Sequence, residues 1–353
     1  MRINIDQYTV YQDRINRLAQ AWRLGSYRPY TVEEAEQAVV QGIPLGVRNI
    51  VGFGFGVKLV RGVPREELVI CGYVVRKVPP NAVEPPFVIE RGVRDILGFD
   101  IATDVLEVGR PAAYHHSNQE YSRRIPGGVA LSNPQLGVYG TLGGWLKDPD
   151  GKPHLLTCWH CLDGGKGAVG DDIFQPKTWK MATLVGSVSP ASNPQSGRPT
   201  VDAAVAKLDD EKLLSDFILG IGEICGTLDN TNLNLPLPVR KYGMTSHLTS
   251  GSIVHASALI TLNMDPAVTI QPNPFDYERQ LLIYPGPTQA SFSDPGDSGA
   301  VVVTEDHKVV GLLVGGSPST NANGPISAAT PIIPVLDELQ HALQKSFEFI
   351  IYP

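Results

Sequence analysis

The stretch that most constrains this chain is Ser291–Val303, which reads SFSDPGDSGAVVV. Pro and Gly at this density break a helix, so the stretch predicts a strained turn that leads directly into a buried strand. Such a turn delivers the side chain of Ser298 to a defined place at the head of that strand. Because Gly296 stands two residues earlier, the amides of Gly296 and Ser298 can point into one small cavity, the geometry that holds a developing oxyanion. A serine there is inert unless a base removes its proton.

The size and charge of the chain limit its class. At 353 residues it is long enough for two domains. The net charge of −7 argues against a nucleic-acid binder, which needs a basic face. With 36 Gly and 29 Pro, the composition favours many turns between short strands.

Three further observations bear on the compartment. The first residues, MRINIDQYTVYQDRINRL, carry several charges and no apolar core, so they are not expected to be a secretory signal. No run of apolar residues is long enough to cross a membrane. The cysteines are too sparse for a disulfide framework in a chain of this size; they are Cys71, Cys158, Cys161 and Cys225. The sequence therefore predicts a cytoplasmic, soluble protein with free thiols, whose oligomeric state stays open.

Residues 1–109 are predicted to form a small α+β domain. Apolar residues at helical spacing predict helices over 6–24 and 31–41, and two β-rich runs follow in Ile50–Val60 and Leu68–Val78. The GFGFG run lacks the strand–loop–helix context of a phosphate loop and is interpreted as strand glycines. Residues 110–126 are polar and are predicted to be a linker, in which His115 and His116 have no further ligand nearby and are expected to be solvated.

Residues 127–353 are predicted to be mainly β. Short strands alternate with turns up to a C-terminal helix over Pro331–Gln344, which has one apolar face. Their number and lengths are those of a pair of six-stranded barrels. The last apolar run, Phe347–Tyr352, is expected to pack on a neighbouring face, with an oligomer contact or a self-docking strand as the alternatives.

Two residues are candidates to activate Ser298. His160 follows an apolar strand and begins the Gly-rich turn LDGGKG, so it is expected at a strand end. Asp202 lies in the apolar run VDAAVAKL, where burying a carboxylate is costly unless it has a partner such as an imidazolium. The alternative for Asp202 is an ordinary acid in a turn at a strand end.

The order His160, Asp202, Ser298 resembles that of the chymotrypsin/trypsin-like serine peptidases. The runs that carry this resemblance are TCWHC at 157–161, VDAAV at 201–205 and GDSG at 296–299. Further runs at 140–144, 241–254, 311–317 and 331–339 resemble the bacterial intracellular trypsin-like group that also includes plant narrow-leaf-type proteins. The resemblance covers 125–343, with a weaker likeness at 45–109. It implies a chymotrypsin-like double β-barrel that hydrolyses protein or peptide substrates through an acyl-enzyme.

The resemblance also assigns roles to residues. Ser298 would be the nucleophile, His160 the general base and then acid, and Asp202 its orienter, with the amides of Gly296 and Ser298 as the oxyanion hole. No cofactor, metal, nucleic acid or membrane is expected. The residues that would bind the substrate are Phe292, Val314, Gly315 and Gly316. Because Phe292 stands where an acid would select Arg or Lys, a trypsin-like preference is not implied.

Some alternatives stay open at this stage. Cys158 and Cys161 spell a redox or half-zinc motif, although no second cysteine pair completes a metal site. Arg124-Ile125 resembles the activating cleavage site of zymogens, in which the new amino terminus pairs with the acid before the serine, here Asp297. Two other functions share the same residues: a peptidase-fold module that binds peptides without cutting them, and an esterase.

Overall fold

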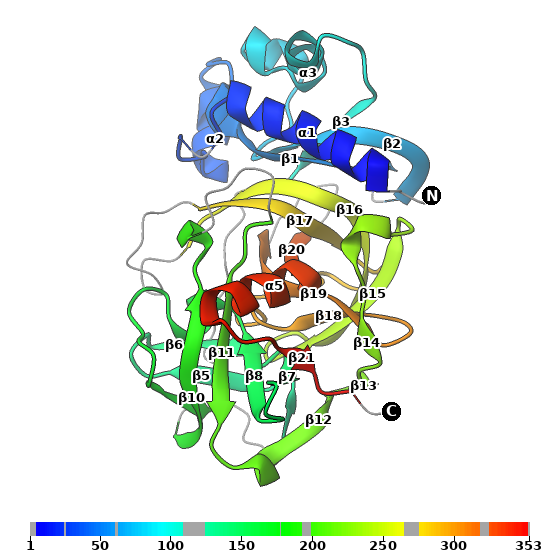
Figure 1. Ribbon diagram of the computed structural model, residues 1–353. Helices are drawn as coiled ribbons and strands as arrows, with labels where there is room; N and C mark the ends of the chain where they lie inside the picture. The colour runs from blue at the N-terminus through cyan, green and yellow to red at the C-terminus, as the bar shows by residue number, and fades with distance from the viewer. Residues whose placement is uncertain are drawn as a thin grey trace.

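The computed structural model describes residues 5–24, 26–60, 63–108, 124–176, 178–192, 199–264, 275–317 and 325–351. The expected linker falls largely outside these residues, and so do His115 and His116. Figure 1 shows three parts along the molecule: an N-terminal part, next to it the β unit that contains residues 237–331, and at the far end the β unit that contains residues 130–208. No helix in the described ranges combines the length and apolarity that a membrane span requires.

The N-terminal part packs helices on a small sheet. The helices are α1 (Ile5–Ala21), α2 (Val32–Val40) and α3 (Ile89–Leu97). Helix α2 begins with a capping box, in which the Thr31 hydroxyl accepts from the amide of Glu34, whose carboxylate accepts from the amide of Thr31. The strands are β1 (Ile50–Val60), β2 (Val63–Val74) and β3 (Thr103–Glu107), with β1–β2 antiparallel and β2–β3 parallel.

The first β unit of the C-terminal region supplies the strands around His160. Its sheet runs in the order β21-β7-β8-β11-β10-β9-β5-β6. The bounds are β5 (Ala130–Asn133), β6 (Val138–Thr141), β7 (Gly144–Lys147), β8 (Pro153–Thr157), β9 (Asp172–Gln175), β10 (Trp179–Val188) and β11 (Ala203–Leu208). A separate small sheet contains β4 (Ile125–Gly127), β12 (Leu214–Ile218) and β13 (Gly222–Glu223).

The second β unit is a closed six-stranded barrel in the order β15-β18-β19-β20-β17-β16, with β16 pairing back to β15. The bounds are β15 (Leu237–Gly243), β16 (His247–Leu262), β17 (Phe275–Pro285), β18 (Val301–Thr304), β19 (Lys308–Ser317) and β20 (Ile326–Pro331), and β14 (Gly226–Thr227) adds to β19. The long strand β16 departs from the short strands expected for this region, because irregularities in register bend it without ending it. The expected mainly β class, with two β units and a C-terminal helix, is confirmed.

The long strand β16 joins the N-terminal part to this barrel. Its first half pairs with β15, and its second half pairs with β1, where Gly52 lies opposite Ile260. A Cβ added at Gly52 would lie 1.8 Å from the carbonyl oxygen of Leu259, so only glycine permits this approach of the two strands. The buried apolar side chains of both parts belong to one cluster. One continuous sheet therefore runs from the barrel into the N-terminal part.

The C-terminal helix lies against both β units. Helix α5 (Ile332–Leu343) contacts β10 and β11 of the first unit and β19 and β20 of the second, and buries Ile332, Val335 and Leu339. The chain then adds β21 (Glu348–Phe349) to the edge of β7, with Phe347 and Phe349 buried. This apolar end therefore buries Phe347 and Phe349, and it does so partly as a strand docked on the chain's own sheet, the alternative that the sequence had left open.

Candidate active site

The Ser298 turn depends on glycine at two positions. Gly296 and Gly299 have φ of +103° and +94°, in the region that side chains rarely enter. A Cβ at Gly299 would also lie 2.1 Å from the Oγ1 of Thr157. The carbonyl of Ser298 accepts from the amide of Thr141 at 2.8 Å, which holds the turn against β6. The density of Gly and Pro thus does produce a tight turn ahead of a buried strand.

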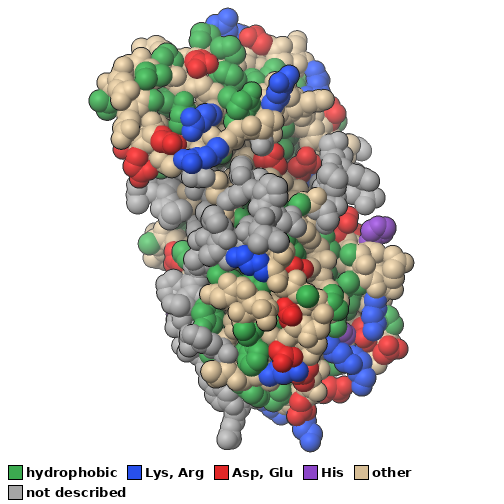
Figure 2. Space-filling model, turned by 90° about the vertical axis from the view of Figure 1, so that its left-hand side faces the viewer, with side chains coloured by type: hydrophobic (Ala, Val, Ile, Leu, Met, Phe, Trp, Pro, Cys, Tyr) green, Lys and Arg blue, Asp and Glu red, His purple; other side chains and the backbone are tan. Residues whose placement is uncertain are grey.

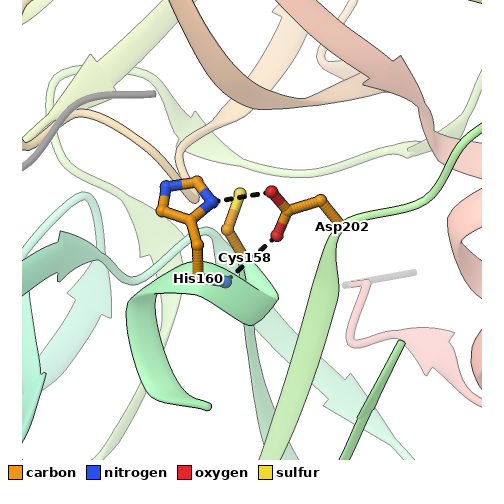
Figure 3. Close-up of side chains that lie close together, drawn as sticks. All are labelled: Cys158, His160 and Asp202. Carbon is orange, nitrogen blue, oxygen red and sulfur yellow. Dashed lines mark hydrogen bonds and ion pairs between the residues drawn. The ribbon is translucent and has the colours of Figure 1, made fainter. Parts of the chain in front are cut away.

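His160 and Asp202 are brought together by the pairing of β8 with β11. Strand β8 ends at Thr157, and the single helical turn α4 (Trp159–Leu162) then carries His160. The Gly-rich turn expected to begin at His160 begins only after this helical turn. Asp202 immediately precedes β11, in which Ala204 lies opposite Thr157. The strand register therefore places the carboxylate beside the imidazole (Figure 3).

The contact between these two residues is bidentate and buried. Nδ1 of His160 lies 2.7 Å from Oδ2 of Asp202, and the amide of His160 donates to Oδ1 at 3.2 Å. The side chains are 1% and 0% exposed. A carboxylate in this position orients the imidazole and fixes the tautomer that keeps its proton on Nδ1.

The electrostatics of the pair favour the imidazolium. Burial on its own lowers the pKa of His160, but Asp202 and Cys161 together outweigh burial and hold this pKa well above the ordinary 6.5. The resulting ion pair stabilises the fold fully below about pH 6.5, and the contribution is lost as pH rises through the raised pKa. His160 becomes a free base only above that raised pKa.

The turns that carry His160 and Ser298 are in contact. The Cys161 thiol donates to the carbonyl of Ser298 at 3.6 Å, and the Cys158 thiol donates to the carbonyl of Leu313 at 3.2 Å. The Ser298 hydroxyl donates to the carbonyl of Val314 at 3.1 Å. Nε2 of His160 is buried and has no hydrogen-bond partner among the described residues. Once the imidazole is neutral, Nε2 is therefore an acceptor that no described group uses.

Two residues of this site were missed from the sequence. Tyr277 donates its hydroxyl to Oδ2 of Asp202 at 2.7 Å. Lys241 forms an ion pair with Oδ2 of Asp297 at 3.0 Å, and neither side chain is exposed. Tyr277 lies in a run with the alternating pattern of an ordinary strand, so nothing in the sequence marked it as a site residue. Lys241 did carry one, because a charge inside a barrel strand needs a buried partner.

The carboxylate of Asp297 is also bound by the backbone of two turns. Oδ1 accepts from the amides of Thr245 and Ser246 at 2.9 and 3.2 Å, and Oδ2 accepts from the amide of Asp294 at 3.0 Å. Burial lowers the pKa of Lys241, while Asp297 opposes this shift. Asp297 is thus the point at which the Ser298 turn is attached to the second barrel.

The cleavage-site hypothesis at Arg124-Ile125 has to account for this ion pair. Ile125 lies in β4, and its carbonyl accepts from the indole of Trp145 at 2.7 Å. The positive charge beside Asp297 comes from Lys241, within the intact chain. A new amino terminus at Ile125 is therefore not required to neutralise Asp297.

The residues assigned to substrate binding lie in two different settings. Phe292 is 1% exposed and packs in the core, where Nζ of Lys241 lies 5.9 Å from its ring centroid. Val314, Gly315 and Gly316 lie in β19, and the two glycines pair with Ala328 and Ser327 of β20. The carbonyl of Val314 accepts from the Ser298 hydroxyl. The substrate-binding role of all four stays a prediction, as does the oxyanion hole.

One group of side chains offers donors of the kind that bind metals. Donor atoms of Cys158, His160 and Asp202 lie within 4.8 Å of one another (Figure 3). Burial raises the pKa of Cys158 well above its usual value, which opposes the thiolate that a metal requires. The imidazole and the carboxylate are already bonded to each other. The arrangement is better described as a hydrogen-bonded pair with a neighbouring thiol.

Comparisons with known proteins give structural neighbours only. No protein-family model matches the chain, and no curated protein matches it. Similar solved structures include Nocardiopsis protease (18% identity, TM-score 0.44), Thermobifida fusca protease A (16%, 0.45) and Cellulomonas bogoriensis chymotrypsin (17%, 0.42). The aligned regions cover 64%, 65% and 65% of this chain, and 98%, 100% and 100% of the respective neighbour's chain. Identities and TM-scores this low do not allow residue roles to be transferred, so the roles below rest on the contacts of this chain.

Proposed function

We propose that this protein is a serine endopeptidase that uses Ser298, His160 and Asp202. The observation that carries the proposal is the buried imidazole of His160, whose Nδ1 is bonded to Asp202 while Nε2 has no partner in the described part of the chain. An imidazole held in this way can accept a proton at Nε2, and the turn of Ser298 contacts the turn of His160. Ser298 would then be the nucleophile, His160 the base and Asp202 the acid that orients the base, which are the three roles that acyl transfer requires.

The first half of the reaction would begin with a rotation of the Ser298 hydroxyl. In the resting structure this hydroxyl donates to Val314, so it must turn toward Nε2 of His160 to lose its proton. The oxygen then attacks the substrate carbonyl, and the imidazolium is stabilised by Asp202. The amides of Gly296 and Ser298 would hold the oxyanion, and His160 would return the proton to the leaving amine.

The reaction of the protein with a fluorophosphonate probe tests this proposal directly. We expect mass spectrometry to find the label on Ser298, and we expect Ser298→Ala and His160→Ala to lose it. Peptide hydrolysis should fall by ~10⁶-fold in Ser298→Ala. The matched control is Ser291→Ala in the same run, because that hydroxyl only donates to Asp294 and its loss should leave labelling intact.

The competing functions give different results in the same experiment. Turnover of small esters without cleavage of any unfolded protein would identify an esterase. Retention of peptides by a folded wild type that takes no label at any pH would identify a binding module and overturn the proposal. A comparison of cleaved peptides from a proteome digested with wild type and with Ser298→Ala would define the substrate.

The pH dependence follows from the raised pKa of His160. Since the base must be neutral, kcat/KM should rise with pH along an acid limb whose midpoint lies well above 6.5, the usual value for histidine. Hydrolysis should accordingly be faster at pH 9 than at pH 7. Initial rates from pH 5 to 10, with circular dichroism to verify folding at each pH, check this. A midpoint at or below 6.5 would contradict it.

A further inference from the structure

A third group binds the carboxylate that orients His160. Oδ2 of Asp202 accepts from the Tyr277 hydroxyl at 2.7 Å and lies 2.7 Å from Nδ1 of His160. Tyr277, like Asp202, is 0% exposed. The oxygen that holds the imidazole is therefore shared with a phenol from another strand.

The chemistry of this contact suits a fixed donor. Burial raises the pKa of Tyr277 well above the usual value, and the charge of Asp202 adds to this, so the phenol keeps its proton. A buried carboxylate gains more from such a donor than an exposed one, because water does not replace it. The phenol draws negative charge away from Oδ2 and also limits the rotation of the carboxylate. Both effects reach His160 through Asp202.

The strand that carries Tyr277 is linked to the N-terminal part of the chain through one intervening strand. In β17, Tyr277 lies opposite Ile260 of β16, and Ile260 lies opposite Gly52 of β1. The approach at Gly52 leaves no room for a side chain. Three adjacent strands thus connect the first sixty residues to the carboxylate of Asp202, a link that neither the triad nor its motifs contain.

We propose that Tyr277 is a positioning residue for the Asp202–His160 pair, and that strand β1 of the N-terminal part supports it through β16 and β17. This proposal rests on the proposed function, because it takes His160 to be the catalytic base. It gives the N-terminal part a role in shaping the active site.

The test compares two Tyr→Phe variants on the same strand. Tyr277→Phe removes the donor to Asp202 and keeps the ring. Tyr284→Phe is the matched control, because the Tyr284 hydroxyl is also buried but makes no hydrogen bond to any residue that the structure describes. We expect kcat to fall about 10- to 100-fold in Tyr277→Phe with KM nearly unchanged, and both constants to stay at wild-type values in Tyr284→Phe. The acid limb should also move to higher pH in Tyr277→Phe, because Asp202 then acts more strongly on the imidazolium.

A second readout does not depend on activity. The Nδ1 proton of His160, hydrogen-bonded to Asp202, should give a far-downfield ¹H NMR resonance that shifts or broadens in Tyr277→Phe and is unchanged in Tyr284→Phe. If the wild type cuts no peptide but this change occurs, Tyr277 positions the pair and the proposed function fails. If the wild type is active and folded Tyr277→Phe matches Tyr284→Phe in kcat, pH limb and resonance, the positioning role is overturned.

Folding of the variant is controlled separately. Near-UV circular dichroism establishes whether Tyr277→Phe retains the native packing. If it does not, site-specific 3-fluorotyrosine at position 277 keeps the ring and makes the phenol a stronger donor. The His160 resonance should then move upfield, because more charge is withdrawn from Asp202. An unchanged resonance in this protein overturns the proposal as well.

Discussion

Replacement of Lys241 by methionine is expected to destabilise the protein by about 3–5 kcal/mol, because it leaves the Asp297 charge buried without its cation. Lys241 and Asp297 are both 0% exposed and 3.0 Å apart. Backbone amides of Thr245, Ser246 and Asp294 would still bind the carboxylate, but they supply only partial charges. Because Asp297 adjoins Ser298, the turn should shift and fluorophosphonate labelling should fall together with stability.

Urea denaturation of Lys241→Met measures this effect, and a second lysine supplies the control. Lys308 forms an exposed ion pair with Asp306 at 2.8 Å, so Lys308→Met should not change the unfolding curve measurably. The double variant Lys241→Met/Asp297→Asn should recover part of the lost stability, since neither charge then remains. If Lys241→Met unfolds at the wild-type denaturant concentration, the ion pair does not hold the turn.

A chain that lacks residues 1–123 is expected to lose cooperative folding. Without residues 1–123, the second half of β16 would lose its pairing with β1, and apolar residues that now belong to the common core would be exposed. Each large apolar side chain left in water costs about 1.5–3 kcal/mol, and several would exceed a total stability of about 5–15 kcal/mol. We therefore expect residues 124–353 alone to aggregate or to show no thermal transition.

Co-expression of the two pieces of the chain distinguishes the loss of the β1–β16 contact from the effect of shortening the chain. If residues 1–108 are supplied as a second chain, β1 can pair with β16 again, and soluble, labelled protein should reappear. The opposite result is also informative: a soluble 124–353 chain with a sharp thermal transition and full labelling would make the N-terminal part an independent module. The division at 109/127 expected from the sequence would then stand, without a role in the active site.

The local parts of the site could be predicted from the sequence. Pro and Gly around Ser298 exclude a helix and force a turn whatever surrounds it, and Gly296 and Gly299 do adopt positive φ. An acid within an apolar run requires a buried partner, and Asp202 has one in His160. The Thr31 capping box likewise depends on residues three positions apart. In the turn and the capping box, the interacting groups are close in sequence. For Asp202, the free-energy cost of burying an unpaired carboxylate is so large that a buried partner could be expected from the sequence.

Only the tertiary structure decided which distant residues complete the site. Tyr277 reaches Asp202 across 75 positions, and its alternation in β17 fits any half-buried strand. Lys241 finds Asp297 only when β15 and the Ser298 turn are placed in the same barrel. The pairing of β1 with β16 turned an apparently separate N-terminal part into an extension of the barrel sheet. The physical reason is register: it is set by packing of the whole sheet, and a shift of one residue would turn each of these side chains to the other face.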